Sequence, residues 1–148
     1  MAYISKNANW YVVEVVEEIT VEGDPRNVVH RNLNLIHAHS PEEAYERAID
    51  LGKQGESEYQ NPAAKKVTIK FRGLSSLNVV HDQLEHGAEL RYLEEVSLPE
   101  TNILHLLKSK EQLEVFQDIQ PTKGPDYACK EIMDEALELI AKDRENQK

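Results

Sequence analysis

The chain contains a single cysteine, Cys129, among its 148 residues. One thiol excludes a framework of internal disulfides, on which many small secreted domains depend. No apolar run approaches the roughly 18–20 residues that a membrane-spanning helix requires, and residues 1–7 lack the apolar core of a secretory signal. We therefore expect a cytoplasmic protein that does not enter a membrane.

Basic residues are also scarce, because 17 Lys and Arg stand against 27 Asp and Glu and give a net charge of −10. Residues 1–98 contain 10 basic and 16 acidic side chains, and residues 99–148 contain 7 and 11, so neither part is basic. Nucleic-acid binding depends on basic side chains that displace counterions from phosphates. We expect no nucleic-acid partner. An acidic surface suits a basic protein partner, or only keeps the protein in solution.

One segment has all the features of a helix that follows a strand. Ser40 can accept a hydrogen bond from a first-turn amide, Pro41 has no amide to leave unpaired, and Glu43 completes a capping box. Gly52 can adopt the left-handed conformation that often ends a helix. These signals predict an amphipathic helix that ends near Gln54, with an apolar stripe made of Ala44, Tyr45, Ala48, Ile49 and Leu51.

Strand patterns surround this helix and are found at residues 10–21, 27–39, 66–72 and 88–98. The first two are joined by a turn at residues 22–25 and predict a hairpin. A bulge near Leu35 would reconcile the two apolar phases of the second strand. Residues 55–64 read as a loop, and residues 73–87 fit either a helix or a short strand. The order β-β-α-β-β predicts an α+β fold, with a mostly antiparallel four-stranded sheet and one covering helix.

The composition divides the chain into an α+β domain at residues 1–98 and a helical C-terminal extension at residues 99–148. A linker is expected near residues 121–125. The last helix, predicted at about residues 126–143, has a wide apolar stripe that includes Cys129, so we expect a buried structural cysteine. Such a stripe has to be covered, either by the protein's own sheet or by another subunit.

A row of basic side chains, Lys66, Lys70 and Arg72, alternates with apolar residues along the third predicted strand. The outer face of the first strand carries Glu14 and Glu18. If the two strands are neighbours, cross-strand ion pairs account for the row.

The sequence contains no complete catalytic, cofactor-binding or metal-binding motif. Two histidines, His37 and His39, lie on one face of a strand end, but two imidazoles are too few for a metal site and no further motif completes them. We therefore assign no catalytic, cofactor or metal residues. Five side chains form a candidate pocket if the fold brings them together, namely Trp10, His37, His39, Arg72 and His81.

Four short motifs occur in a recognisable order: Trp-Tyr-Val-Val at residues 10–13, the helix start at residues 38–48, Phe-Arg-Gly-Leu at residues 71–74 and Gly-Ala-Glu-Leu at residues 87–90. In these motifs and their order, the chain resembles the uncharacterised bacterial domain-of-unknown-function family numbered 4288, over about residues 10–98. The resemblance implies a small bacterial cytosolic α+β protein. It supplies no catalytic residues.

These observations favour a non-enzymatic protein-interaction module that binds a protein partner or forms a homo-oligomer. One version is an acidic protein that masks a basic partner, as immunity proteins do. The alternative is a small-molecule-binding or enzymatic domain with a pocket near Trp10 and His37. Convergence of two or more of the candidate side chains on a concave pocket favours the second hypothesis.

Overall fold

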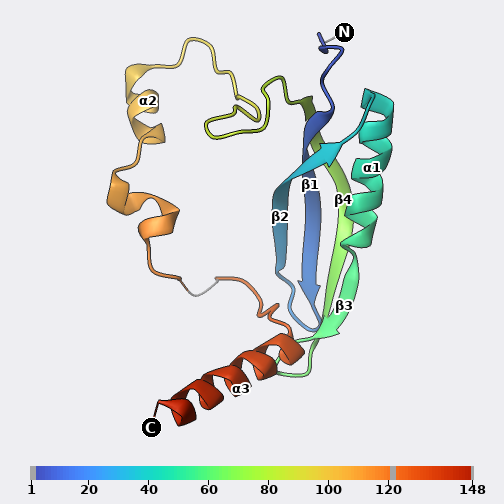
Figure 1. The fold of residues 1–148 in the computed structure, drawn as a ribbon. Coiled ribbons are helices and arrows are strands. Elements are labelled where there is room, and N and C mark those ends of the chain that lie inside the picture. The colour runs from blue at the N-terminus through green and yellow to red at the C-terminus, as the bar shows by residue number, and fades with distance from the viewer. Residues whose placement is uncertain (1–2, 121–122, 148) are drawn as a thin grey trace. The chain divides into compact units, whose positions relative to one another are not determined.

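The computed structural model describes residues 3–120 and 123–147, and it contains a four-stranded sheet (Figure 1). The elements are β1 (Trp10–Val21), β2 (Asn27–His37), α1 (Pro41–Gln54), β3 (Ser57–Gln60), β4 (Lys66–Val79), α2 (Glu100–Leu106), 3₁₀ turns at Lys110–Gln112 and Glu114–Phe116, and α3 (Lys130–Asn146). The strands form one antiparallel sheet in the order β2-β1-β4-β3. The predicted α+β class and the β-β-α-β-β order are confirmed.

The chain divides into two compact units, one made of Met1–Arg91 and Gly124–Lys148 and the other of Tyr92–Lys123. The first unit contains the sheet, α1 and α3, and the second contains α2 and the two 3₁₀ turns. Within the described part of the chain, no helix has the length and apolar character needed to cross a membrane.

Two of the predicted strand assignments are wrong. A loop was predicted where β3 lies, and β3 pairs with β4 from Ser57 opposite Ile69 to Gln60 opposite Lys66. Residues 88–98, predicted as a strand, have no regular secondary structure. The place that was predicted for this segment in the sheet is taken by β3, which pairs with Lys66–Ile69 of β4 and completes the four-stranded order. The ambiguous segment continues β4 as far as Val79.

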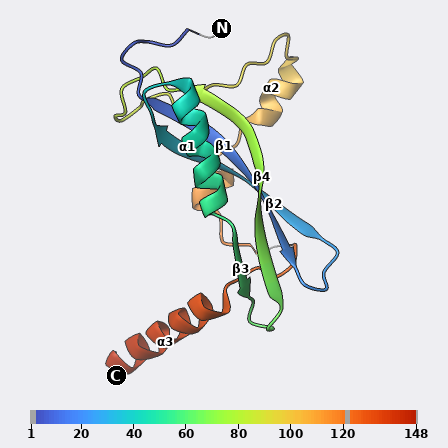
Figure 2. The same cartoon turned by 90° about the vertical axis from the view of Figure 1, so that its right-hand side faces the viewer.

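Helix α1 covers one face of the sheet, which we call the inner face (Figure 2). The alternation of β1 places Tyr11, Val13 and Val15 on this face, each no more than 3% exposed. Opposite them, Ala44 and Ala48 of α1 are completely buried, and their small side chains let the helix approach the strands closely. Tyr45, which was predicted to belong to the apolar stripe, is 55% exposed, so the buried stripe is narrower than expected.

A second cluster fills the far end of the inner face, around Ile19, Val21 and Val67. Here the C-terminal segment before α3 covers the sheet. The Tyr59 hydroxyl donates a hydrogen bond to the Tyr127 carbonyl, and the Tyr127 ring joins the cluster.

Further contacts hold the same segment on the sheet. The Asn61 side-chain amide donates to the Asp126 carbonyl at 3.0 Å. The rings of His30 and Tyr127 lie 5.6 Å apart in an edge-on contact. Of the predicted linker at residues 121–125, Pro125 is buried, and residues 121–122 lie outside the described part of the chain.

The pairing of β1 with β2 is regular, so the predicted bulge near Leu35 is wrong. Apolar residues on both faces of β2 explain the two phases that suggested it. Irregularities lie instead between β1 and β4, at Glu14/Val15 and Val16/Glu17. Gly73 next to the second one has a φ of 140°, which an L side chain rarely adopts.

Helix α1 starts and ends where predicted, at Pro41 and Gln54, but Gly52 does not have the predicted role. The Ser40 side chain accepts a hydrogen bond from the Glu43 amide at 3.1 Å, and the Glu43 carboxylate accepts one from the His39 amide at 3.3 Å. Gly52 was predicted to stop the helix, yet it is helical and α1 continues to Gln54. A Cβ at Gly52 would lie 2.3 Å from the ring of Phe71, so glycine is needed there for close packing.

The last helix, α3, begins at Lys130 instead of near residue 126, because the preceding residues pack on the sheet in a non-helical conformation. Cys129 is the residue that precedes the helix, and it is half-buried. The expectation of a cysteine on a buried helical stripe is therefore wrong. None of the described residues of α2 or α3 is buried.

The close contact at Gly52 can be tested with Gly52→Ala. Forcing a methyl group against the Phe71 ring costs about 1–3 kcal/mol, and the better helix propensity of alanine offsets about 1 kcal/mol of this. We expect a net loss of about 1 kcal/mol in the free energy of unfolding, measured by urea denaturation with an unchanged slope.

Gly55→Ala is the matched control. Its Cβ would lie 2.7 Å from a carboxylate oxygen of Glu17, a flexible side chain that can move away, and 3.4 Å from the Gly52 carbonyl oxygen, which is an ordinary contact. We expect a change below about 0.5 kcal/mol for Gly55→Ala. A Gly52→Ala protein as stable as the wild type would show that the Phe71 contact does not constrain α1.

Candidate functional site

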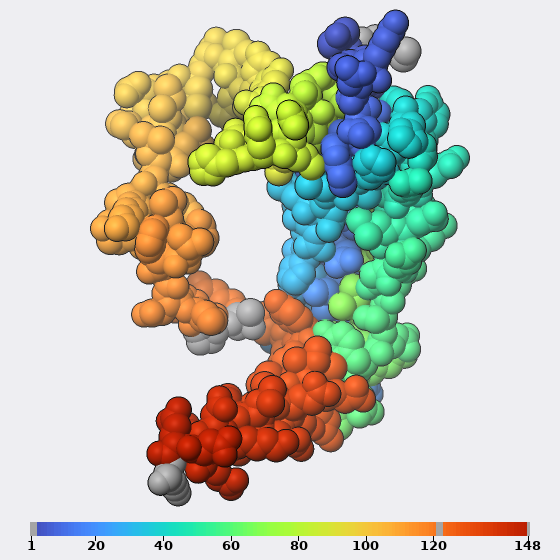
Figure 3. Space-filling model, viewed as in Figure 1, coloured from blue at the N-terminus to red at the C-terminus, as the bar shows by residue number. Residues whose placement is uncertain are grey.

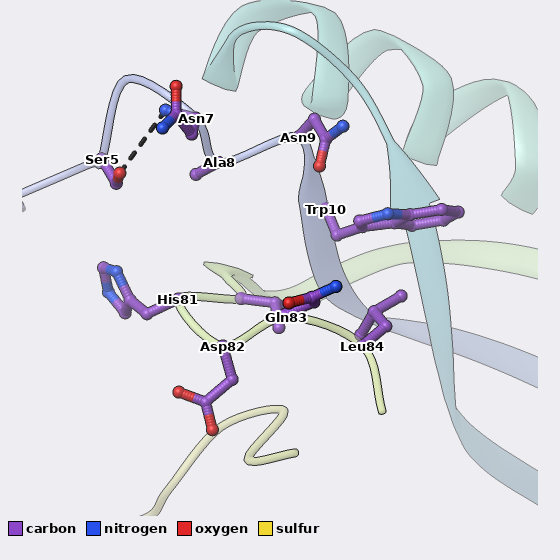
Figure 4. Close-up of a pocket in the computed structure, with 10 residues that line it drawn as sticks. Ser5, Asn7, Ala8, Asn9, Trp10, His81, Asp82, Gln83 and Leu84 are labelled. Atoms are coloured by element: carbon purple, nitrogen blue, oxygen red, sulfur yellow. Dashed lines mark hydrogen bonds between the residues drawn. The ribbon is translucent and has the colours of Figure 1, made fainter. Parts of the chain in front are cut away.

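A cavity of about 420 Å³ lies where the chain enters β1 and leaves β4 (Figure 4). The Val80 amide donates to the Trp10 carbonyl at 2.9 Å and brings the two segments together. The side chains at the cavity are mainly polar around one indole, and the lining residues are Ser5, Asn7, Ala8, Asn9, Trp10, Val80, His81, Asp82, Gln83 and Leu84. Such a mixture of one aromatic group and several amides suits binding of a polar small molecule.

Four of the five candidate pocket residues lie at this end of the sheet. Trp10 and His81 line the cavity. The His37 ring contacts the Trp10 ring edge-on with centroids 4.9 Å apart, and His39 contacts His37 in the same manner at 5.4 Å. The fold therefore places His37 and His39 behind the indole, whereas His81 lies at the cavity.

Arg72 is not part of this group. Its guanidinium forms an ion pair with Glu18 at 3.6 Å, on the face of the sheet opposite α1, which we call the outer face. Lys70 lies opposite Glu18 in the β1–β4 register, and Lys66 pairs with Glu58 of β3 at 3.4 Å. The predicted adjacency of the two strands and a cross-strand ion pair between Arg72 and Glu18 are confirmed, but Lys66 pairs with β3 and Glu14 has other partners.

The cavity offers few groups for catalysis. The Asp82 carboxylate accepts a hydrogen bond from the Glu89 amide at 2.9 Å and so closes the turn that follows β4. The His81 ring stacks on Tyr3 with centroids 6.4 Å apart. Within residues 3–120 and 123–147, no group of three or more His, Cys, Asp or Glu side chains is placed to hold a metal ion. This arrangement can bind a ligand but contains no recognisable nucleophile–base pair.

Among the residues that the structure describes, Glu14 is the one buried carboxylate of the outer face, with the residue 3% exposed. Arg31 from β2 donates to one of its oxygens, and Arg91 donates to the other at 3.1 Å. Arg91 also donates to the Ser76 hydroxyl at 3.0 Å. These bonds attach the irregular segment after β4 to the centre of the sheet.

Burial raises the pKa of Glu14, but hydrogen bonds from Ser75, Arg31 and Arg91 outweigh this effect and hold its pKa below the ordinary value of 4.5. Arg31 and Arg91 are not among the residues predicted from the sequence. The hairpin register could have identified Arg31, because it lies opposite Val16, two residues from Glu14. Nothing in the sequence indicates Arg91, which reaches Glu14 from a segment without regular structure.

The outer face also carries exposed apolar side chains. Val29, Leu33 and Leu35 occupy alternate positions of β2 and are 51%, 56% and 42% exposed. Arg31 lies within this row with 69% of its side chain exposed, and Arg72 on β4 is 52% exposed. We call these five residues together with Lys70 the outer patch, which is apolar and basic.

Helix α3 carries the complementary type of surface. On the face of the molecule that Figure 3 shows, its side chains (red) are open to solvent. Its apolar stripe is 43–65% exposed and consists of Ile132, Met133, Leu137, Leu139 and Ile140. The helix also contains six acidic and three basic side chains, so it is apolar and acidic.

The second unit, residues 92–123, also exposes apolar side chains. They lie on or beside α2 and the 3₁₀ turns. Leu104, Leu106, Leu107, Leu113 and Phe116 are 40–65% exposed, and Val115 is 85% exposed. Large exposed apolar surfaces on a protein are typical of interaction sites.

A family model described as a domain of unknown function (DUF4288) matches residues 10–92. This range contains all four strands, α1 and the Glu14 ion pairs, and it contains the part of the cavity lining that Trp10 and residues 80–84 form. No curated protein and no solved structure matches the chain.

The Glu14 ion pairs predict a defined pH dependence of stability. Since the folded-state pKa of Glu14 is lowered, its charge stabilises the fold above about pH 4.5, and this contribution is lost as the pH falls through the folded-state pKa. Glu14→Gln should therefore be destabilised relative to the wild type near pH 7, and the difference should shrink in acid. Urea unfolding at several pH values measures this difference.

Glu18→Gln is the matched control, because Glu18 lies on the same face and pairs with the half-exposed Arg72. It should cost less stability than Glu14→Gln. A difference between Glu14→Gln and the wild type that is the same at every pH would show that the charge of Glu14 is not what stabilises the fold.

Proposed function

The chain belongs to the DUF4288 family of domains of unknown function, and we propose that it acts as a non-enzymatic protein-interaction module. The observation that carries this proposal is the exposed apolar stripe of α3. Five large apolar side chains of one helix are at least 43% exposed, and no described residue of that helix is buried. A helix with such a stripe is typical of a segment that places its apolar face against a partner.

Charge supports the same proposal. The net charge of −10 favours encounter with basic surfaces, and the acidic side chains of α3 surround its apolar stripe. One form of the module is an acidic protein that masks a basic partner, and another is a homo-oligomer. As part of the same proposal, we take the protein to be a bacterial, cytoplasmic one.

The cavity favours a second candidate function, which is small-molecule binding at the Trp10 end of the sheet. Two of the five candidate residues, Trp10 and His81, converge on a cavity of about 420 Å³. The polar lining and the absence of a recognisable nucleophile–base pair in it favour binding over catalysis. We place this candidate second because the cavity engages a few residues, whereas the exposed apolar stripe extends along α3 from Ile132 to Ile140.

The interaction module can be tested with the double substitution Leu137→Gln and Ile140→Gln. Both side chains are at least 50% exposed, so thermal stability should be preserved. The double variant should lose the stoichiometric partner, whether another protein or a second copy, that the wild type retains in a native pull-down analysed by mass spectrometry.

Glu138→Gln, on the acidic side of α3, is the matched control and should retain the apolar contact. Recovery of the same partner with the double variant would contradict the proposal. So would a wild-type protein that stays monomeric and retains no stoichiometric partner at low salt.

The small-molecule candidate has an independent test, because Trp10 is the only tryptophan in the chain. A compound released by denaturing the purified protein and identified by mass spectrometry should change the Trp10 fluorescence when it is added back. The compound should be absent from His81→Ala and present in Tyr45→Phe, whose side chain does not line the cavity. Equal retention by both variants would exclude the cavity as the binding site.

A further inference from the structure

We propose that the outer patch of the sheet binds the α3 helix of a second copy of this chain, so that two copies form a reciprocal dimer. The inference rests on the proposed interaction function and identifies the partner as the chain itself.

The apolar row of β2 is longer than the apolar stripe of α3. On β2, Val29 to Leu35 spans six residues, which is about 20 Å in a strand. On α3, Ile132 to Ile140 spans eight residues, which is about 12 Å in a helix. The helical stripe can therefore lie entirely within the exposed row of the strand, where its side chains would meet residues that are 42–56% exposed.

The charges of the two surfaces are complementary. The outer patch contributes Arg31, Lys70 and Arg72, and its acidic neighbours Glu14 and Glu18 already have arginine partners. Arg31 donates to Glu14, yet its side chain remains 69% exposed and can meet a second carboxylate.

The acidic groups of α3 lie where they can meet these cations. At 100° per residue, Asp134 and Glu135 flank the apolar stripe of α3 on its two sides. A helix seated on the apolar row of β2 therefore brings carboxylates to both of its margins. The margin that faces β1 and β4 is the one on the side of Lys70 and Arg72, whereas Arg31 lies within the row itself.

The anchoring of α3 explains why the partner is a second copy. The helix begins three residues after Tyr127, and Tyr127 is held on the inner face by the Tyr59 hydroxyl and the His30 ring. The outer patch of the same copy therefore lies behind the sheet from the point where α3 starts. A second copy has no such restriction.

A two-fold dimer makes the contact twice. The helix of each copy would lie on the outer patch of the other, as a two-fold axis requires when two different surfaces of one chain pair reciprocally. The dimer would bury twice the area of a single helix-on-sheet contact.

The test uses the full chain and measures its mass in solution by sedimentation velocity. One variant changes the outer patch (Leu33→Glu with Leu35→Glu) and another changes α3 (Leu137→Glu with Ile140→Glu). All four positions are at least 42% exposed, so both variants should fold, which far-ultraviolet circular dichroism and thermal melting check. We expect a wild-type dimer and two monomeric variants.

Mixing the two variants provides the decisive measurement. The α3 variant retains an intact outer patch and the patch variant retains an intact helix, so an equimolar mixture should form heterodimers through one remaining contact. Tyr45→Glu, a charge at an exposed position of α1 outside both surfaces, should remain dimeric.

Three results would overturn the inference: a wild-type monomer at all concentrations, a dimer that survives the patch substitutions, or variants that remain monomeric when mixed. Its failure can be distinguished from failure of the proposed function. A monomeric wild type that still retains another protein through Leu137 and Ile140 would leave the interaction module intact with a different partner.

Discussion

The close approach of α1 to the sheet is the constraint on which the rest of the structure depends. Ala44 and Ala48 are completely buried, and Gly52 lies where any Cβ would collide with Phe71. Small residues at these three positions allow the helix to cover Tyr11, Val13 and Val15 of β1. Since one helix covers only part of the inner face, residues 124–129 cover the remainder, and Tyr127 completes the second core cluster there. The C-terminal segment is thus part of the core.

The outer face is the one that α1 does not cover, and its side chains are of a different kind. At the centre of the outer face, Glu14 is buried and stabilised by arginines from β2 and from the segment after β4. A buried carboxylate without its arginines would be strongly unfavourable, so these bonds attach an otherwise irregular segment to the sheet. At the edge, on β2, the apolar side chains of Val29, Leu33 and Leu35 remain exposed. The protein therefore presents an apolar and basic sheet edge together with an apolar and acidic helix.

The two functional candidates use opposite kinds of surface. The cavity beside Trp10 is small and polar, and its titratable groups are partly engaged in holding the local turn. The faces of α3 and β2 are extended, apolar and bordered by charges of opposite sign. Extended apolar surfaces are stabilised by burial in proportion to their area, which makes macromolecular binding the function that the described residues support best.

Local patterns in the sequence determined β1, β2, the start of α1 and the α+β class, because period-two alternation and helix capping act between residues close in the chain. The sequence also identified Trp10, His37, His39 and His81, which lie at one end of the sheet. Only the tertiary structure decided that Ser57–Gln60 is a strand, that Arg72 lies apart from the cavity, and that Arg91 reaches Glu14. Those outcomes depend on which strand edges are free and on contacts between distant residues, and neither leaves a periodic signal in the chain.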